Sequence, residues 1–288
     1  MKTYKVGTRK SKLALSQTQI AIDLLEKETE YDFEIRTLDT IGDKENWKSI
    51  EEIEGDGVFT RELDEALINE AIDIAVHSAK DVPTNLRKEI SIGAFTERKY
   101  PSDVIIGNKF NELKDGALIG TGSPRRQEQI KRKRPDLKVT KVRGNVETRI
   151  SKIGKEVDAV VLAEAGIQRL GIEKKISEKL PINDFLPAPG QGSLCITYRK
   201  GENKIKKLLN KVDHNKTSKA VKAERAAMNE FGLGCTVPVG AHAHIKNNKL
   251  YIKLEHVEKR KKVTLSGKAN KAEEIGRKAA KKIIGEKK

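Results

Sequence analysis

The sequence predicts an α/β fold in which two α/β lobes face each other across a cleft and a small α+β domain ends the chain. Strand and helix patterns alternate through the first part of the chain, two short motifs recur in its two halves, and three strand patterns follow one another near its end. With 288 residues, the chain is long enough for two or three domains.

Two interruptions divide the predicted elements. Tyr100-Pro101 ends the first series, and the Pro/Gly-rich segment 181–192 ends the second. The strand pattern of Ser193–Tyr198 then allows the chain to return to the first lobe. The predicted domains are a first lobe at 1–96 with the return segment 193–210, a second lobe at 100–188, and a C-terminal domain at 215–288.

In the first lobe, the order of the elements predicts a largely parallel sheet. Ser11 is placed to cap the first helix, and Leu63 and Leu67 face inward from the second. Residues 42–58 are polar and acidic and are expected to form a long loop. The predicted elements are strand Tyr4–Thr8, a helix carrying Leu13, Ile20, Leu24 and Leu25, a strand with Phe33, Ile35 and Thr37 alternating, helix Thr60–Glu70 and strand Ile72–Val76.

The second lobe repeats this alternation. Its predicted elements are strands Val104–Ile106 and Ala117–Thr121, helix 124–133, strand Leu137–Val142, helix 145–153 and strand Asp158–Ala163. Two local echoes link the lobes: Val6-Gly7-Thr8 resembles Ile119-Gly120-Thr121, and Asp73–Val76 resembles Asp158–Val161. Because the spacing between the echoes differs, we expect a similar architecture and not a strict repeat.

The tail is expected to form a separate α+β domain. An Asn247-Asn248 turn is expected between its first two strands. The predicted elements are helix 218–230, strands Gly240–Ile245, Leu250–Val257 and Val263–Gly267, and a basic helix at 271–284.

The net charge of +16 favours an anionic partner, which leaves nucleic acid, an anionic membrane and an acidic small molecule open. No apolar run approaches the length of a membrane span, and the N-terminus has no apolar segment of the signal-peptide kind. The two cysteines, Cys195 and Cys235, show no C-x-x-C spacing and fit a reducing compartment. We therefore expect a cytoplasmic protein that contacts no membrane.

The strand pattern Ile72–Val76 ends in a group of polar and ionisable residues, which are His77, Ser78, Lys80 and Asp81. Ligands of α/β proteins bind beyond the carboxyl ends of strands, so this group is a candidate site. The alternative is that Ser78 or Asp81 only caps the next turn and that the lysine is a solvated charge.

Several arginines lie at predicted strand ends. Arg125 and Arg126 lie in the first turn of a helix, where backbone N–H groups already favour anions. Two cations at this positive helix end are unfavourable without an anion, which indicates a ligand. Arg143, Arg149 and Arg9 lie at or near other strand ends, and arginine binds carboxylates in bidentate fashion. The pattern predicts a ligand with several carboxylates or phosphates.

The basic run at 131–134 is expected to be solvated surface, although the whole segment is alternatively a nucleic-acid contact. Against that alternative, aromatic residues make up only 4% of the chain and are not interleaved with the basic ones. Cys235 lies in the glycine-flanked loop GLGCTVP, a position that suits a reactive or modified thiol but does not by itself require one. Cys195 lies in the apolar pattern SLCITY and is expected to be an inert core residue.

Taken in order, motifs along almost the whole chain resemble the porphobilinogen deaminase family, also called hydroxymethylbilane synthases. No single motif is specific, but the ordered set is. The motifs are VGTRKSKLAL, GVFTRELDEAL, DIAVHSAKDVPT, GTGSPRRQEQI, RPDLKV, VRGNVETRI, LAEAGIQRLG, LPAPGQG and AERAAMNEFGLGCTVPVGAHA.

The resemblance implies two periplasmic-binding-protein-like lobes and a small third domain that carries a cofactor cysteine. It implies a transferase of tetrapyrrole biosynthesis, the route to porphyrins and heme. Such an enzyme joins four porphobilinogen molecules head to tail, releases ammonia each time, and ends by hydrolysis to linear hydroxymethylbilane. It further implies a monomer with a dipyrromethane cofactor, no metal and no nucleic-acid partner.

Residue by residue, the resemblance implies that Asp81 is catalytic and that Cys235 holds the dipyrromethane through a thioether. The other residues matched to cofactor binding are Lys80, Thr121, Ser123, Arg125, Arg126, Arg143 and Gly144. The residues matched to substrate binding are Arg9, Ser11, Gln17, Arg149, Arg169 and Gln191.

The chemistry of these residue types agrees with the implied reaction. Each pyrrole unit adds an acetate and a propionate, about two negative charges with pKa values near 4, which suits an arginine cluster. A carboxylate at Asp81 can hold the pyrrole N–H and stabilise the cation left when ammonia departs. The alternative is a non-catalytic two-lobed binder of a polycarboxylate anion, which would need neither Asp81 nor Cys235.

One departure from the family pattern lies before Thr60, where Asp56 stands in place of a common lysine. A lysine contact from this loop to substrate is therefore in doubt, although Lys44 or Lys48 is placed to substitute.

Overall fold

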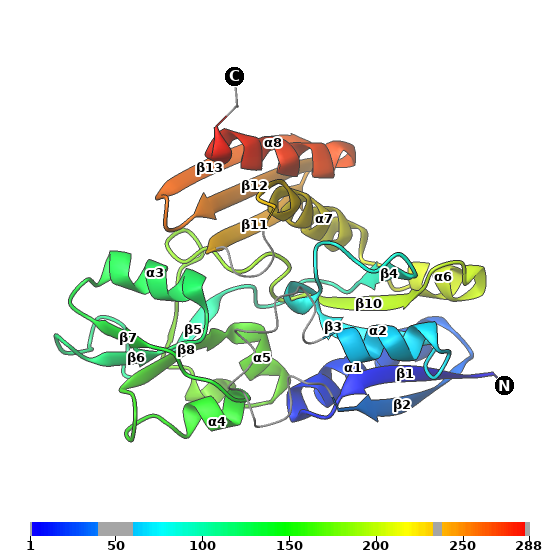
Figure 1. The fold of residues 1–288 in the computed structure, drawn as a ribbon, viewed down its shortest axis with the longest axis horizontal. Coiled ribbons are helices and arrows are strands. Elements are labelled where there is room, and N and C mark those ends of the chain that lie inside the picture. The colour runs from blue at the N-terminus through cyan, green and yellow to red at the C-terminus, as the bar shows by residue number, and fades with distance from the viewer. Residues whose placement is uncertain (1, 40–59, 233–237, 286–288) are drawn as a thin grey trace. The chain divides into compact units, whose positions relative to one another are not determined.

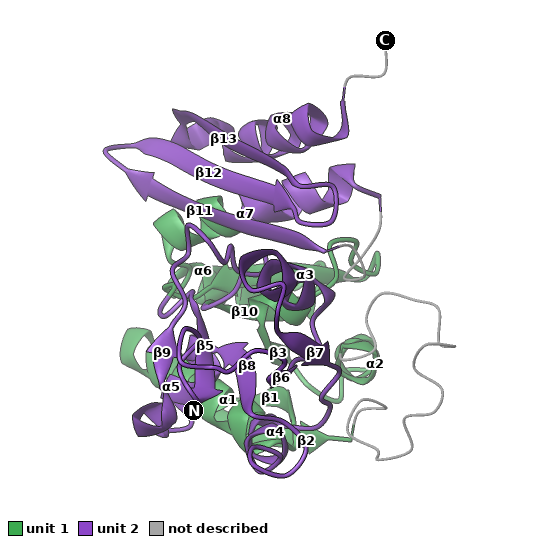
Figure 2. Cartoon of the chain, turned by 90° about the vertical axis from the view of Figure 1, so that its left-hand side faces the viewer, with its two compact units in different colours: residues 1–98, 193–221 green, residues 99–192, 222–288 purple. Residues whose placement is uncertain are grey.

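The structure is a computed structural model that describes residues 2–39, 60–232 and 238–285. The chain forms two compact units, residues 1–98 with 193–221 and residues 99–192 with 222–288, which Figure 2 shows in separate colours. The predicted loop 42–58, with Asp56, and the loop residue Cys235 lie outside the described residues.

The first unit is built on a five-stranded sheet in the order β2-β1-β3-β10-β4 (Figure 1). Strand β1 is parallel to β2 and β3, whereas β10 is antiparallel to both β3 and β4. The chain therefore returns to the first sheet through β10. The elements are β1 (Thr3–Arg9), α1 (Lys12–Glu28), β2 (Asp32–Leu38), α2 (Arg61–Ile68), β3 (Ile74–Ser78), β4 (Ile90–Phe95), β10 (Leu194–Arg199) and α6 (Asn203–Asn210).

The second unit holds a five-stranded sheet in the order β7-β6-β8-β5-β9. Strand β6 is parallel to β7 and β8, and β5 is antiparallel to β8 and β9. The elements are β5 (Asp103–Gly107), β6 (Leu118–Gly120), α3 (Pro124–Lys133), β7 (Lys138–Thr140), α4 (Val146–Ile150), β8 (Ala159–Ala163), α5 (Glu164–Arg169) and β9 (Glu178–Lys179).

An antiparallel sheet of three strands, in the order β11-β12-β13, completes the second unit. Asn247 and Asn248 turn the first pair with φ values of 49° and 55°, as predicted. The elements are α7 (Asn215–Glu230), which belongs to the first unit up to Val221, β11 (Val239–Lys246), β12 (Lys249–His256), β13 (Lys261–Lys268) and α8 (Ala272–Ile284).

These sheets confirm the predicted α/β class with a small α+β C-terminal part. The largely parallel sheet predicted for the first lobe is confirmed for β1, β2 and β3. One strand in each five-stranded sheet, β10 or β5, runs antiparallel to its neighbours. The domain limits drawn from the sequence stay a prediction. None of the described helices is both long and apolar enough to span a membrane.

The two sequence echoes occupy equivalent places in the two five-stranded sheets. Strands β1 and β6 hold one position, and β3 and β8 hold the next. A carboxylate oxygen of Asp73 accepts the backbone N–H of Lys5 at 2.7 Å, and one of Asp158 accepts that of Leu118 at 2.7 Å. The predicted similarity of architecture therefore extends to individual hydrogen bonds.

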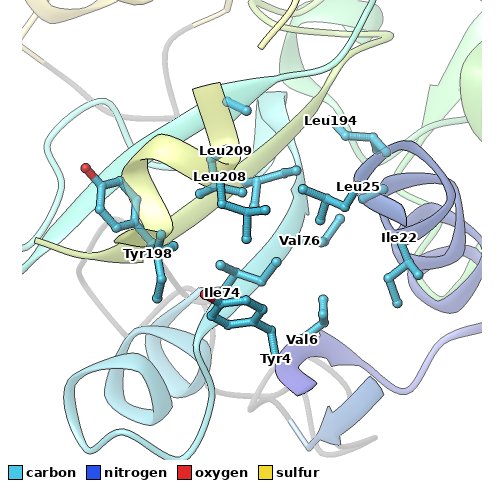
Figure 3. Packing of buried hydrophobic residues seen from close by; sticks show 14 residues of the cluster. Tyr4, Val6, Ile22, Leu25, Ile74, Val76, Leu194, Tyr198, Leu208 and Leu209 are labelled. Carbon is cyan, nitrogen blue, oxygen red and sulfur yellow. The ribbon is translucent and has the colours of Figure 1, made fainter. Parts of the chain in front are cut away.

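The core of the first unit joins residues that lie far apart in the sequence. Val6, Leu25, Ile74, Leu194 and Leu209 come from five different elements, and each is fully buried in one cluster (Figure 3). Burial of this apolar surface is what holds the return strand β10 and helix α6 against the N-terminal strands.

Helix α1 shows where the apolar pattern was misleading. Ile20 and Leu24 are 36% and 37% exposed, whereas the polar residues Gln17 and Thr18 are buried. Burial is tolerated because the Thr18 hydroxyl donates to the carbonyl of Ala14 at 2.9 Å and the Gln17 amide is also paired. The sequence patterns did not predict β4, α5 or α6.

Candidate active site

In the first unit, the carboxyl ends of β1 and β3 lie at the same edge of the sheet. The two strands are parallel neighbours with Gly7 opposite Ala75, so Arg9 and Ser78 end adjacent strands. Ser11 follows β1 and caps α1 as predicted, since its Oγ accepts the N–H of Ala14 at 3.2 Å. The strand ends thus bring together polar residues that are distant in sequence.

Gln17 connects α1 to the end of β3. Its Nε2 donates to Ser78 Oγ at 2.8 Å, and its side chain is buried. This contact fixes the helix over the strand end. The predicted substrate contacts of Arg9, Ser11 and Gln17 stay predictions.

Asp81 lies in a short helical turn, Ala79–Asp81, directly after β3. The turn is anchored because Ala79 donates its N–H to the carbonyl of Ser193 at 3.0 Å and packs in an apolar cluster. Ser78 makes no side-chain capping bond to this turn. Asp81 and Lys80 are half-buried, and among the described residues the Asp81 carboxylate accepts no hydrogen bond. The carboxylate therefore caps no backbone group in the described chain.

His77 belongs to the sheet and not to the polar group at its end. It is 6% exposed, and its Nε2 lies 2.9 Å from Thr197 Oγ1 on β10. Burial, together with the nearby charge of Arg9, lowers the pKa of His77 to about 4. The imidazole is therefore neutral at neutral pH.

In the second unit, Arg125 and Arg126 are buried at 4% and 6% exposure and share one carboxylate, that of Asp103. Arg125 Nη1 donates to Asp103 Oδ2 at 2.8 Å, and Arg126 Nη2 donates to Oδ1 at 2.7 Å. Gln191 Nε2 also donates to Oδ1, at 2.9 Å. One buried acid therefore organises three of the predicted site residues.

The premise that no anion offsets this arginine pair without a ligand is wrong, because Asp103 is a counterion of both guanidinium groups within the unit. Their binding of the cofactor stays a prediction. Sequence reasoning missed Asp103, although a signal was present. A lone acid at the start of the apolar strand DVIIG has to be paired if the strand is buried.

The turns after β6 and β7 carry the other predicted residues. Thr121 is buried and donates its N–H to the carbonyl of Thr140 at 2.9 Å, while its Oγ1 accepts the N–H of Ser123 at 3.3 Å. Gly144 has a φ of 106°, which favours glycine, and its carbonyl accepts Arg149 Nε at 2.7 Å. Arg143 precedes this turn at the surface.

Arg169 ends α5 and donates through Nη2 to the carbonyl of Gly192 at 2.9 Å. Burial lowers the pKa of Arg169 to about 10, so the guanidinium is still charged at neutral pH. Arg169 therefore contacts the end of the Pro/Gly-rich segment 181–192, at the residue that follows Gln191.

The basic run at 131–134 is only partly solvated, which corrects the sequence prediction. Arg132 pairs with Glu255 at 2.5 Å, and Arg134 pairs with Asp136 at 2.6 Å and donates to the carbonyl of Phe110 at 2.8 Å. These arginines hold α3 to neighbouring segments of its own unit.

Cys195, predicted to be an inert core residue, is fully buried in β10.

The chain matches two domains of one protein family over nearly its full length. Residues 4–207 match "Porphobilinogen deaminase, dipyromethane cofactor binding domain", and residues 218–285 match "Porphobilinogen deaminase, C-terminal domain". Porphobilinogen deaminase of Carboxydothermus hydrogenoformans is 46% identical over 86% of this chain and 81% of its own length. That of Desulforamulus reducens is 40% identical over 97% and 93%.

Among solved structures, the chain is similar to the periplasmic VFT2 domain of Bordetella pertussis BvgS. The identity is 18%, the alignment covers 73% of this chain and 86% of that chain, and the TM-score is 0.43.

The two five-stranded sheets define an α/β protein, and arginines and the half-buried Asp81 lie at or near its strand ends. The chain belongs to the porphobilinogen deaminase family. It is a transferase of tetrapyrrole biosynthesis, and its family domain is one that binds the dipyrromethane cofactor.

The second unit fits a cofactor that carries several carboxylates. Arg126 Nε is buried and has no hydrogen-bond partner in the described part of the chain. A buried N–H donor requires an acceptor, and a carboxylate is the preferred acceptor of a guanidinium. The two guanidinium groups also share a single carboxylate, that of Asp103, so their positive charge is only half balanced by it.

Proposed function

We propose that this chain condenses four porphobilinogen molecules onto a dipyrromethane held by Cys235, with Asp81 as the catalytic carboxylate. The product is linear hydroxymethylbilane. The observation that carries the assignment of Asp81 is its place at the end of β3, half-buried and without a hydrogen bond among the described residues.

The residues that would hold the dipyrromethane are the arginine pair of α3 and the further residues that the family resemblance implies. When bound, the cofactor supplies the primer on which the chain grows and which stays when the product leaves. Guanidinium groups fixed in place bind acetate and propionate groups without reorganising. The residues proposed for this role are Lys80, Thr121, Ser123, Arg125, Arg126, Arg143 and Gly144, with Cys235 as the covalent attachment.

Asp81 acts on the substrate. When the C–N bond of the aminomethyl group breaks, ammonia leaves with the bonding electrons and the remaining pyrrole carries a positive charge. A carboxylate within reach of the pyrrole N–H stabilises that charge and can take up the proton that is lost when the new C–C bond forms. Arg9, Ser11, Gln17, Arg149, Arg169 and Gln191 are proposed to hold the carboxylates of porphobilinogen.

We also propose that the enzyme is a cytoplasmic monomer with no nucleic-acid or membrane partner, on the strength of the sequence interpretation. Light scattering in solution tests the monomer directly, because a dimer doubles the mass.

The decisive experiment is the intact mass of the purified protein before and after incubation with porphobilinogen. We expect a stable adduct of two pyrrole units, then a ladder of one to four further units during turnover. Cys235→Ser is expected to abolish both the adduct and the ladder. A wild-type protein that shows neither, even after reconstitution with porphobilinogen, would be a non-catalytic anion binder, and the proposal would fail.

A further inference from the structure

Asp103 binds three side chains that the proposed function uses, although no part of that function assigns it a role. It opens β5, and its side chain is fully buried. Its Oδ2 accepts Arg125 Nη1, and its Oδ1 accepts both Arg126 Nη2 and Gln191 Nε2, at 2.7 to 2.9 Å. Both carboxylate oxygens are thus committed to predicted site residues.

The fold itself does not require an acid at this place. Asp103 pairs with Ala163 at the end of β8, and Leu194 pairs with Ser78 at the end of the equivalent strand β3. Leu194 is fully buried in the apolar core of its unit. Leucine therefore fills the equivalent position in the first unit, and the acid in the second unit serves the arginines.

The carboxylate is charged at neutral pH. Burial alone raises the pKa of Asp103, but the charges and hydrogen bonds of Arg125 and Arg126 outweigh burial and hold the pKa well below its ordinary value. Since two guanidinium groups share one carboxylate, one positive charge is left over.

Arg126 is held at two corners of its guanidinium group. Nη1 donates to the carbonyl of Val161 at 3.1 Å and Nη2 donates to Asp103, whereas Nε is buried without a partner in the described residues. A planar fork fixed at two nitrogens cannot turn the third toward another acceptor. The contact with Asp103 therefore leaves the Nε–H donor of Arg126 available to a ligand.

We propose that Asp103 is the positioning residue of this arginine pair: it fixes both guanidinium groups before an anionic ligand arrives and leaves one positive charge for that ligand. The inference rests on the proposed function, in which Arg125 and Arg126 bind the carboxylates of the dipyrromethane. Asp103 acts through these arginines, so its removal should change cofactor binding beyond any change in stability.

Asp103→Asn is the informative substitution. An amide of the same shape presents one oxygen and one NH₂, so one of the two arginines faces a donor in place of an acceptor. Asp103→Glu keeps the charge and tests rescue. Asp136→Asn is the matched control, because Asp136 is also an ion-pair partner of an arginine in the same unit and accepts Arg134 Nε and Nη2.

The intact mass of each purified protein gives the fraction that carries the dipyrromethane, and urea unfolding gives its stability. We expect Asp103→Asn to lower the cofactor-bearing fraction at least about tenfold, the loss typical of a charged hydrogen bond. Asp136→Asn should keep that fraction within about twofold of wild type, even where its urea midpoint falls as far as that of Asp103→Asn. Asp103→Glu should recover more cofactor than Asp103→Asn.

If the wild-type protein carries cofactor and turns over porphobilinogen, the proposed function stands. Two results would then overturn the inference about Asp103. One is an Asp103→Asn protein with the wild-type cofactor fraction. The other is a loss of cofactor in Asp103→Asn and Asp136→Asn that only follows their urea midpoints, since Asp103 would then be a structural counterion. A wild type with neither cofactor nor turnover overturns the proposed function and this inference together.

Discussion

Ionisable residues that look alike in the sequence have different roles once their surroundings are known. Asp81 and Asp103 each lie at an end of a buried strand, yet Asp103 is fully buried between two arginines and Asp81 is half-buried with no hydrogen bond among the described residues. His77, four residues before Asp81, is neutral and packed in the sheet. Burial and hydrogen-bond partners, not residue type, separate the structural groups from the carboxylate that is proposed to be catalytic.

The role of Asp81 predicts a graded response to substitution. Asp81→Glu should retain part of the turnover of porphobilinogen, because the charge survives at a shifted position. Asp81→Asn should lose at least about a hundredfold in kcat, since the neutral amide does not stabilise the developing cation. Steady-state rates on cofactor-bearing protein check this, with circular dichroism to confirm folding. Equal rates in both variants would contradict the assignment.

His77 predicts a pH dependence of stability. The unfolded chain binds a proton at His77 below a pH of about 6.5, whereas the folded protein binds it only below about 4. Its contribution to stability is therefore complete above pH 6.5 and is lost as the pH falls toward 4, by up to about 3 kcal/mol. Urea unfolding of wild type and His77→Asn from pH 7 to 4 measures it.

The wild-type advantage over His77→Asn should shrink across that window. Asp64 acts in the opposite direction, because burial raises its pKa to about 6 and its folded form takes up a proton first. Asp64 is present in both proteins, so the difference between them isolates His77. A difference that stays constant with pH would contradict the prediction.

At the scale of elements, local patterns predicted the long and amphipathic segments well. Helix α3 has the predicted bounds, 124–133, and the three C-terminal strands lie where alternation placed them. Strand β4 and helices α5 and α6 were missed, because they are short and their apolar residues contact segments distant in the sequence. Their stability comes from packing more than from intrinsic preference.

The contact between α7 and α8 predicts that a glycine-to-alanine substitution destabilises the protein, although helix propensity alone predicts that it stabilises. Alanine at an ordinary helical glycine stabilises by about 1 kcal/mol. At Gly276, however, a Cβ would lie 2.0 Å from the backbone oxygen of Ala223, and a helix backbone cannot move aside cheaply. We expect Gly276→Ala to lower the free energy of unfolding by at least about 2 kcal/mol, measured with urea.

Lys278→Ala on the exposed face of the same helix is the control, and it should change stability by less than about 0.5 kcal/mol. A Gly276→Ala protein as stable as wild type would mean that α8 shifts freely on α7.

At the scale of the whole molecule, the chain leaves the first sheet after β4 and re-enters it through β10. Strand β10 lies between β3 and β4, so residues 193–221 belong to the same unit as residues 1–98. Ile196 lies at the centre of this strand, opposite Val76 and Ala94, and is fully buried. The return strand is therefore part of the core of the first unit.

Truncating Ile196 should consequently weaken the unit as a core residue does. We expect Ile196→Ala to cost about 2–5 kcal/mol and Ile196→Val about 0.5–1.5 kcal/mol in the free energy of unfolding. Ile284→Ala, at a side chain that is 42% exposed, is the control and should stay near wild type. A small loss at Ile196 would show that β10 contributes little to the stability of the unit.

The sequence by itself determined the α/β class, the cap at Ser11, the Asn247-Asn248 turn and the ordered motifs that identify the family. These features are local: a periodicity, a capping oxygen or a run of neighbouring residues can be read without knowing what lies opposite. Only the tertiary structure decided that β5 and β10 run antiparallel, that His77 is neutral and that Arg125 and Arg126 share Asp103. The physical reason is that burial and charge pairing depend on residues about twenty to more than a hundred positions apart, which only the folded chain brings together.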